Sequence, residues 1–121
     1  MRKEILAIIA VLALAGVPAW AGEGGDERTA LQRIVCSNPA NATQKAICED
    51  AELRRMDEDM RQVLDRLMSR IPQEDERARG DLIYSQQRFA HVRRLCQGNL
   101  SCLKRIYAGR LKTLRAALAA H

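Results

Sequence analysis

The sequence predicts an all-α protein: a small antiparallel helical bundle of three long helices and a short N-terminal helix, stapled by two disulfides. Apolar residues recur every three or four positions over three long stretches between residues 51 and 118, which is the period of an amphipathic helix. No stretch alternates with a period of two, so we expect no sheet. Four cysteines, Cys36, Cys48, Cys96 and Cys102, follow a segment typical of export signals, and an exported chain with an even cysteine count is expected to form disulfides.

The first 21 residues have the pattern of a cleaved signal peptide. Arg2 and Lys3 give a basic start, an apolar run extends over residues 5–17, and the small-x-small ending Ala19-Trp20-Ala21 precedes Gly22. The apolar run of about 13 residues is too short to span a bilayer. We therefore expect a signal peptide over 1–21, a flexible polar leader over 22–35 and one helical domain over 36–121. Because the apolar run is short and no lipobox is present, we expect a periplasmic or secreted protein that neither spans the membrane nor carries a lipid anchor.

The first half of the domain is expected to hold a short helix and a long one. Asn41 or Thr43 can cap a short helix that runs to about Cys48. The first long helix is expected over residues 51–70, where Asp50 and Glu52 suit the positive end of the helix dipole. Its apolar stripe comprises Leu53, Met56, Met60, Val63, Leu64, Leu67 and Ile71.

The second half is expected to hold two further long helices. Pro72 ends the first long helix and can open the next, which would have Glu74, Asp75 and Glu76 in its first turn and run to about Leu95. Gly98 is a natural left-handed helix terminator, and the last helix begins at about Leu100. The apolar stripes, which we assign to the core, are Ala78, Leu82, Ile83, Tyr84, Phe89 and Val92 in one helix and Leu103, Ile106, Tyr107, Leu111, Leu114 and Leu118 in the other.

Three long helices joined by short loops are expected to be antiparallel neighbours. This topology brings all the cysteines to one end of the bundle, where both local and crossed pairings are feasible. We favour the local pairs Cys36–Cys48 and Cys96–Cys102. The first pair would tie the leader and the short helix to the bundle and stabilise it by roughly 3 kcal/mol on the chain-entropy model.

Metal binding and catalysis are disfavoured by the motif content. The cysteine spacings C-x11-C and C-x5-C lack the paired C-x2-C of common zinc sites, and neither His91 nor His121 has an i, i+4 partner. The chain has no glycine-rich phosphate loop, no G-x-S-x-G motif and no histidine beside a nucleophile motif. We therefore predict no enzyme activity, no metal and no cofactor.

Charge is unevenly distributed along the domain. Residues 22–80 hold 10 basic and 13 acidic residues, whereas residues 81–121 hold 8 basic residues and one acidic residue, Asp81. For an exported protein, such a basic segment would meet an acidic protein or an anionic envelope surface rather than a nucleic acid.

Several short motifs together resemble the LprI-like lysozyme inhibitor family. The opening half is similar to that family's C…IC…LxxLD run in Val35-Cys36, Ala46-Ile47-Cys48 and Leu53-x-x-Met56-Asp57, followed by Met60. The closing half resembles its Q-x-x-W-x-x-x-R-x-x-C and CLxxxYxxRIxxL patterns in Gln86-x-x-Phe89-x-x-x-Arg93-x-x-Cys96 and Cys102-Leu103-x-x-x-Tyr107-x-x-Arg110-Leu111-x-x-Leu114. The likeness covers about 80 residues, and Phe89 replaces the usual Trp as the aromatic anchor.

The resemblance implies a small secreted helical domain that inhibits lysozyme by non-covalent binding. The common animal lysozymes are strongly basic, so such an inhibitor would present an acidic patch. Candidate partner-binding residues are Glu49, Asp50, Glu52, Glu58 and Asp59, although Arg54, Arg55, Arg61 and Arg66 interleave with them at spacings that favour internal pairing. The alternative is an envelope-associated binding module for an anionic or protein partner, without lysozyme inhibition.

Four polar positions that match the family pattern are expected to form an internal network. Asp57, Gln86, Arg93 and Arg110 would lie at similar heights in an antiparallel bundle, at a rise of about 1.5 Å per residue. We expect the acid and the two arginines to satisfy one another as charge-assisted hydrogen bonds, with Arg115 in solvent.

Overall fold

The computed structural model describes residues 33–120. The predicted signal peptide over 1–21 and most of the predicted leader, residues 22–32, lie outside the described residues. Within 33–120 the chain forms four helices and no strand: α2 (Ala42–Glu49), α3 (Ala51–Arg70), α4 (Glu76–Leu95) and α5 (Leu100–Ala120). The predicted all-α class is confirmed for this part of the chain.

The helix starts follow from short polar caps. The Asn41 side chain accepts a hydrogen bond from the Gln44 N–H at 2.9 Å and begins α2, and Asp50 accepts from the Leu53 N–H at 3.0 Å and begins α3. Thr43, the other predicted cap, is buried inside α2.

The start of α4 differs from the prediction. Asp75 accepts a hydrogen bond from the Ala78 N–H at 3.1 Å and is the N-cap of this helix, so Pro72 and Glu74 lie in the loop before it. The side-chain cap satisfies an N–H of the first turn and so fixes the helix start, whereas Pro72 only presets a φ that is compatible with a helix.

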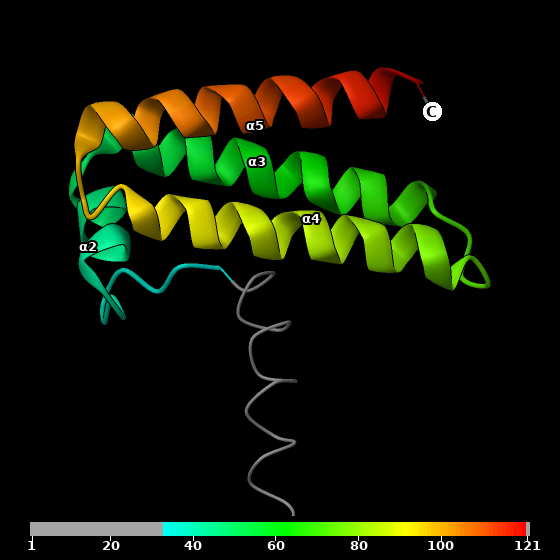
Figure 1. The fold of residues 1–121 in the computed structure, drawn as a ribbon, viewed down its shortest axis with the longest axis horizontal. Coiled ribbons are helices and arrows are strands. Elements are labelled where there is room, and N and C mark those ends of the chain that lie inside the picture. The colour runs from blue at the N-terminus through cyan, green and yellow to red at the C-terminus, as the bar shows by residue number, and fades with distance from the viewer. Residues whose placement is uncertain (1–32, 121) are drawn as a thin grey trace, which may run out of the picture.

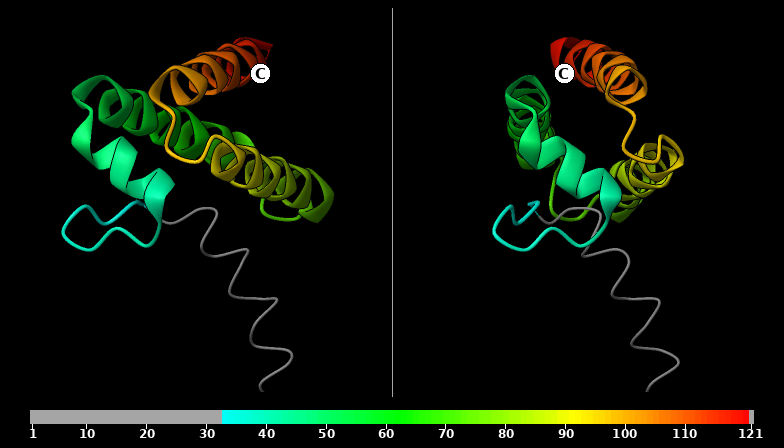
Figure 2. Two further views of the ribbon diagram at one scale, coloured as in Figure 1. Left: turned by 60° about the vertical axis from the view of Figure 1, so that its left-hand side comes forward. Right: turned by 90° about the vertical axis from the view of Figure 1, so that its left-hand side faces the viewer.

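The three long helices run side by side, and α2 lies across one end of them (Figure 1). Consecutive long helices are antiparallel, as predicted, but the most extensive contact joins α3 to α5, which run in the same direction (Figure 1). Figure 2 shows α3, α4 and α5 at the corners of a triangle when viewed along the bundle. Helix α4 packs against α3 and α5 less extensively than these two helices pack against each other, so it is the least tightly packed of the three.

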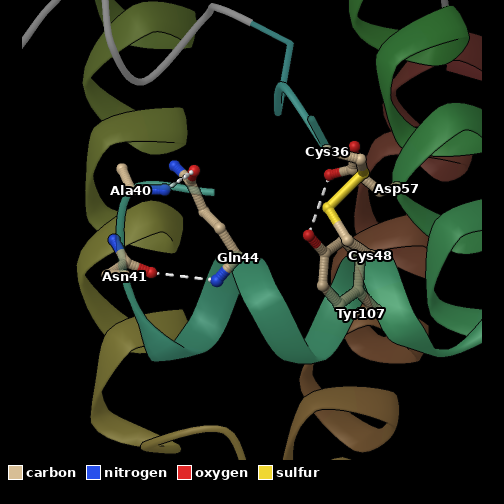
Figure 3. The surroundings of a disulfide bond; sticks show 7 residues. All are labelled: Cys36, Ala40, Asn41, Gln44, Cys48, Asp57 and Tyr107. Carbon is tan, nitrogen blue, oxygen red and sulfur yellow. Dashed lines mark hydrogen bonds between the residues drawn. A yellow bond between two sulfur atoms is a disulfide. The ribbon is translucent and has the colours of Figure 1, made fainter. Parts of the chain in front are cut away.

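Both predicted disulfides are present. Cys36 is bonded to Cys48 and Cys96 to Cys102, with Cα–Cα distances of 5.5 and 5.6 Å, within the normal range for disulfides. The first joins the segment before α2 to the end of that helix (Figure 3). The second closes the turn between α4 and α5, where Gly98 has a left-handed φ of 81°, as predicted.

The core lies mainly between α3 and α5. Its buried apolar residues are Ile47, Leu53, Met60, Val63, Leu64, Leu67, Phe89, Cys96, Leu103, Tyr107, Leu111 and Leu114. From α4 only Phe89 and Cys96, which follows its last residue, contribute to this set, and the predicted core residues Tyr84 and Val92 are 61% and 41% exposed. The inward row of α4 is Leu82, Gln86, Phe89 and Arg93, so two polar side chains occupy places that the apolar stripe was expected to fill. No helix among residues 33–120 is both long and apolar enough to cross a membrane.

Candidate functional site

A buried hydrogen-bonded triad joins the three long helices. Tyr107 Oη on α5 donates to Asp57 Oδ1 on α3 at 2.8 Å, and Arg93 Nη1 on α4 donates to Tyr107 Oη at 2.9 Å. Arg93 Nη1 also lies 3.6 Å from Asp57 Oδ1. Burial raises the pKa of Tyr107 well above its usual value, so the hydroxyl keeps its proton and can donate to the carboxylate. Figure 3 shows the Tyr107–Asp57 bond near the first disulfide.

A second, partly buried polar cluster joins α5 to α4. Arg110 Nη2 donates to Gln86 Oε1 at 3.0 Å and to Ser85 Oγ at 2.9 Å. Gln86 is 0% exposed, and its amide nitrogen lies 3.7 Å from the sulfur of Met60 on α3. Burial lowers the pKa of Arg110. The expected network of Asp57, Gln86, Arg93 and Arg110 is thus two clusters, and neutral oxygens of α4, rather than an acid, hold Arg110.

Phe89 lies between the two clusters. Its ring meets the Tyr107 ring edge to face, with centroids 5.1 Å apart. The guanidinium carbons of Arg93 and Arg110 lie 5.9 and 5.8 Å from the Phe89 centroid, within the range of weak cation–π attraction. The Phe89 ring therefore packs against the buried Arg93 and the half-buried Arg110.

The acidic residues at the start of α3 are paired with a lysine of α5. Lys104 Nζ lies 3.5 Å from Asp50 Oδ2 and 3.0 Å from Glu52 Oε2. The hydrogen bond from the Leu53 N–H is the main cause that lowers the pKa of Asp50, and the Lys104 charge adds to it. Glu49 is exposed at the end of α2. Of the three acids at this junction, two therefore share one cation.

The other two candidate partner-binding acids are also ion-paired. Arg33 Nη1 contacts both carboxylate oxygens of Glu58, at 2.6 and 2.8 Å, and Arg115 Nη2 lies 3.9 Å from Asp59 Oδ2. The paired cations come from outside α3, whereas the sequence suggested arginines within it. Internal pairing reduces the negative potential that this face presents.

An open groove with a volume of about 400 Å³ lies between α4 and α5. Its lining residues are Ser85, Arg88, Phe89, Val92, Ile106, Gly109, Arg110 and Thr113. The groove therefore has apolar and cationic side chains and no carboxylate. It lies along a pair of helices that pack together much less closely than α3 and α5 do.

Several cations on the two groove-forming helices have no ion-pair partner in the described part of the chain. Within residues 33–120, no carboxylate lies within 4.0 Å of a charged nitrogen of Arg88, Arg94, Arg105 or Lys112. Most acids of α3 are thus ion-paired, whereas much of the positive charge of α4 and α5 remains available to a partner.

Three residues have roles that sequence reasoning missed. Tyr107 was assigned to the apolar stripe, but its hydroxyl centres the buried triad. Ser85 holds Arg110. Arg61, which was predicted only to pair with neighbouring acids of its helix, is buried; burial lowers its pKa, and the nearby Asp57 charge opposes this shift. The spacing of Asp57 and Arg61 by one helical turn was the available signal that both side chains lie on the inward face.

The site has no arrangement typical of a metal centre, because the described residues contain no group of three or more His, Cys, Asp or Glu side chains that could hold an ion. No protein-family model, curated protein or solved structure matches this chain.

Proposed function

We propose that this protein is an exported binding module that holds a partner protein non-covalently. The observation that carries the proposal is the α4–α5 groove, an open apolar surface with unpaired cations beside it. Large exposed apolar side chains flanked by charge are typical of interaction surfaces. The residues of the two polar clusters, in contrast, are engaged with one another and are best explained as determinants of stability.

Affinity capture tests this function. The mature, oxidised chain is immobilised and exposed to periplasmic extract and to host secretions, with reduced and alkylated chain as the matched control. We expect saturable recovery of a protein by the oxidised chain only. Recovery of lipid or polysaccharide alone, or equal recovery by both forms, contradicts the proposal.

Lysozyme inhibition is the second candidate function, and the sequence resemblance to LprI-like inhibitors favours it. The supporting observation is the junction of α2 and α3, where Glu49, Asp50 and Glu52 lie within four positions of the chain and only Asp50 and Glu52 are paired, both with Lys104. A net negative patch at this end would attract a basic enzyme.

A lysis assay tests inhibition. Micromolar protein is expected to slow lysis of cell-wall substrate, and reversal of charge at Glu49 and Glu52 should weaken the effect more at low salt than at high salt, because salt screens exposed charges. Glu74, exposed in the α3–α4 loop, is the control site for charge reversal. An unchanged lysis rate with several lysozyme types excludes this activity and leaves the binding module intact.

A further inference from the structure

We infer that the α4–α5 groove receives an acidic amphipathic helix of a partner protein, laid lengthwise between the two helices. This inference rests on the proposed binding function and names the class of partner. A helix that docks in this position would add a fourth member to the triangle of α3, α4 and α5 (Figure 2).

The shape of the groove suits a helix. Phe89 is buried and Ile106 is half-buried, so the apolar floor is recessed. On α4 the positions Tyr84, Arg88 and Val92 follow one another at spacings of four residues and Leu95 follows three later, which places them on one face. Tyr84, Val92 and Leu95 are 61%, 41% and 67% exposed. Tyr84 and Leu95 thus continue the exposed face of the groove residues Arg88 and Val92, and the whole row spans about three helical turns, or about 16 Å. The i, i+3, i+4 and i+7 anchors of a helix-in-groove contact span about 10 Å and fit within this length.

Gly109 supplies a second observation. A glycine inside a helix destabilises it relative to alanine, and a Cβ added at Gly109 would meet nothing within 4 Å. Packing within the chain therefore does not require glycine here. Its effect is to leave the α5 backbone open to the groove, so that a side chain of a docked helix can approach closely.

The positive charge around the groove favours an acidic partner helix. Arg88 and Arg110 line the groove, exposed Arg105 and Lys112 are on the same helix as Gly109, and Asp81 is the only acid in residues 81–121. An acidic helix is complementary to this surface. A second copy of the chain docked at the same groove would oppose arginine to arginine, and a flat bilayer surface would not enter a recess between two helices.

The test uses the oxidised mature protein and a defined probe. The probe is a helical peptide on the order of 18 residues, or about 27 Å, with leucines at i, i+3, i+4 and i+7 and glutamates elsewhere; its lysine counterpart and anionic phospholipid vesicles are the comparison ligands. We expect amide shifts from the acidic peptide to concentrate in α4 and α5 around Val92, Gly109 and Thr113. The lysine peptide and the vesicles should not cause them.

Two variants and a matched control locate the contact. Gly109→Leu fills the groove and Arg88→Glu reverses its charge, so each should weaken peptide binding by about tenfold or more. Gly80→Leu is the control, because a Cβ at Gly80 also meets nothing within 4 Å and Gly80 does not line the groove. Equal weakening by Gly80→Leu, equal binding of the lysine peptide, or shifts only with vesicles would overturn the inference. If a partner captured as described above binds Gly109→Leu unchanged, the binding function stands and the groove is not its site.

Discussion

Tyr107 Oη lies 2.8 Å from Asp57 Oδ1 although 50 residues separate them in the chain. The same hydroxyl accepts from Arg93, so one phenol satisfies an acid of α3 and an arginine of α4 at once. Buried polar groups that lack partners are costly, and this hydroxyl therefore couples the packing of all three long helices.

Replacement of this hydroxyl is the first prediction. Tyr107→Phe should lower the free energy of unfolding by about 1–3 kcal/mol, because Asp57 and Arg93 would each lose a buried hydrogen bond. Denaturant unfolding followed by circular dichroism measures the change. Tyr84→Phe is the matched control, since Tyr84 is exposed and its hydroxyl should contribute little. Equal stability of the two variants would show that the triad is not stabilising.

The second prediction compares two arginines of α5. Arg110→Ala should destabilise the fold by about 1–3 kcal/mol by leaving Gln86 and Ser85 without their donor. This cost is smaller than expected for a buried ion pair, because Arg110 has neutral acceptors. Arg115→Ala should change stability by less than about 0.5 kcal/mol, since Arg115 is exposed and its ion pair spans 3.9 Å.

The comparison requires two measurements on each variant, the melting temperature and the binding of the partner. If Arg110→Ala melts like wild type but loses partner binding, Arg110 belongs to the interaction surface and not to the internal cluster. The groove position of its side chain makes this second measurement necessary.

Local sequence signals predicted the helices well. Period, caps and breakers act within one or two turns, so Asn41, Asp50 and Gly98 mark boundaries that the structure reproduces. Where two local signals competed, at Pro72 and Asp75, only the formed hydrogen bond decided the helix start. The topology predicted from sequence left both local and crossed disulfide pairings feasible, and the structure contains the local pairs that we favoured.

Side-chain partners were harder to predict because they depend on helix rotation. Heights along the bundle correctly grouped Asp57 with Arg93, but height does not say which way a side chain points about the helix axis. That rotation turns Arg110 toward Gln86 and turns Tyr84 and Val92 outward. The groove could not be foreseen, since a stripe of apolar residues has the same appearance whether another helix of the chain covers it or a partner does.

The third prediction concerns the cysteines. The mature oxidised protein should contain no alkylatable thiol, and peptide mapping should recover the pairs Cys36–Cys48 and Cys96–Cys102. Replacing the first pair by serines should reduce stability by roughly 3 kcal/mol, and replacing the second by roughly 2 kcal/mol because its loop is shorter. Crossed peptides, or four reactive thiols under non-reducing denaturation, would contradict this pairing.

The last prediction links pH to the cap of α3. The pKa of Asp50 is lowered in the folded protein by the Leu53 N–H hydrogen bond and by Lys104, so the folded state binds fewer protons at this group than the unfolded state. Its contribution is therefore fully present above the unfolded value of about 3.9 and is lost as pH falls through the lower folded value.

Asp50→Asn isolates that contribution. Asparagine caps helices about as well as aspartate, so the variant keeps an acceptor for the Leu53 N–H but has no charge to titrate. We expect wild type to lose more stability than Asp50→Asn between pH 6 and about 3, near the carboxylate range, in thermal unfolding at each pH. Asp75→Asn is the matched control, because Asp75 caps α4 through the Ala78 N–H without a cation within ion-pair distance among residues 33–120. A wild-type profile parallel to that of Asp50→Asn would show that the capping interaction is independent of charge.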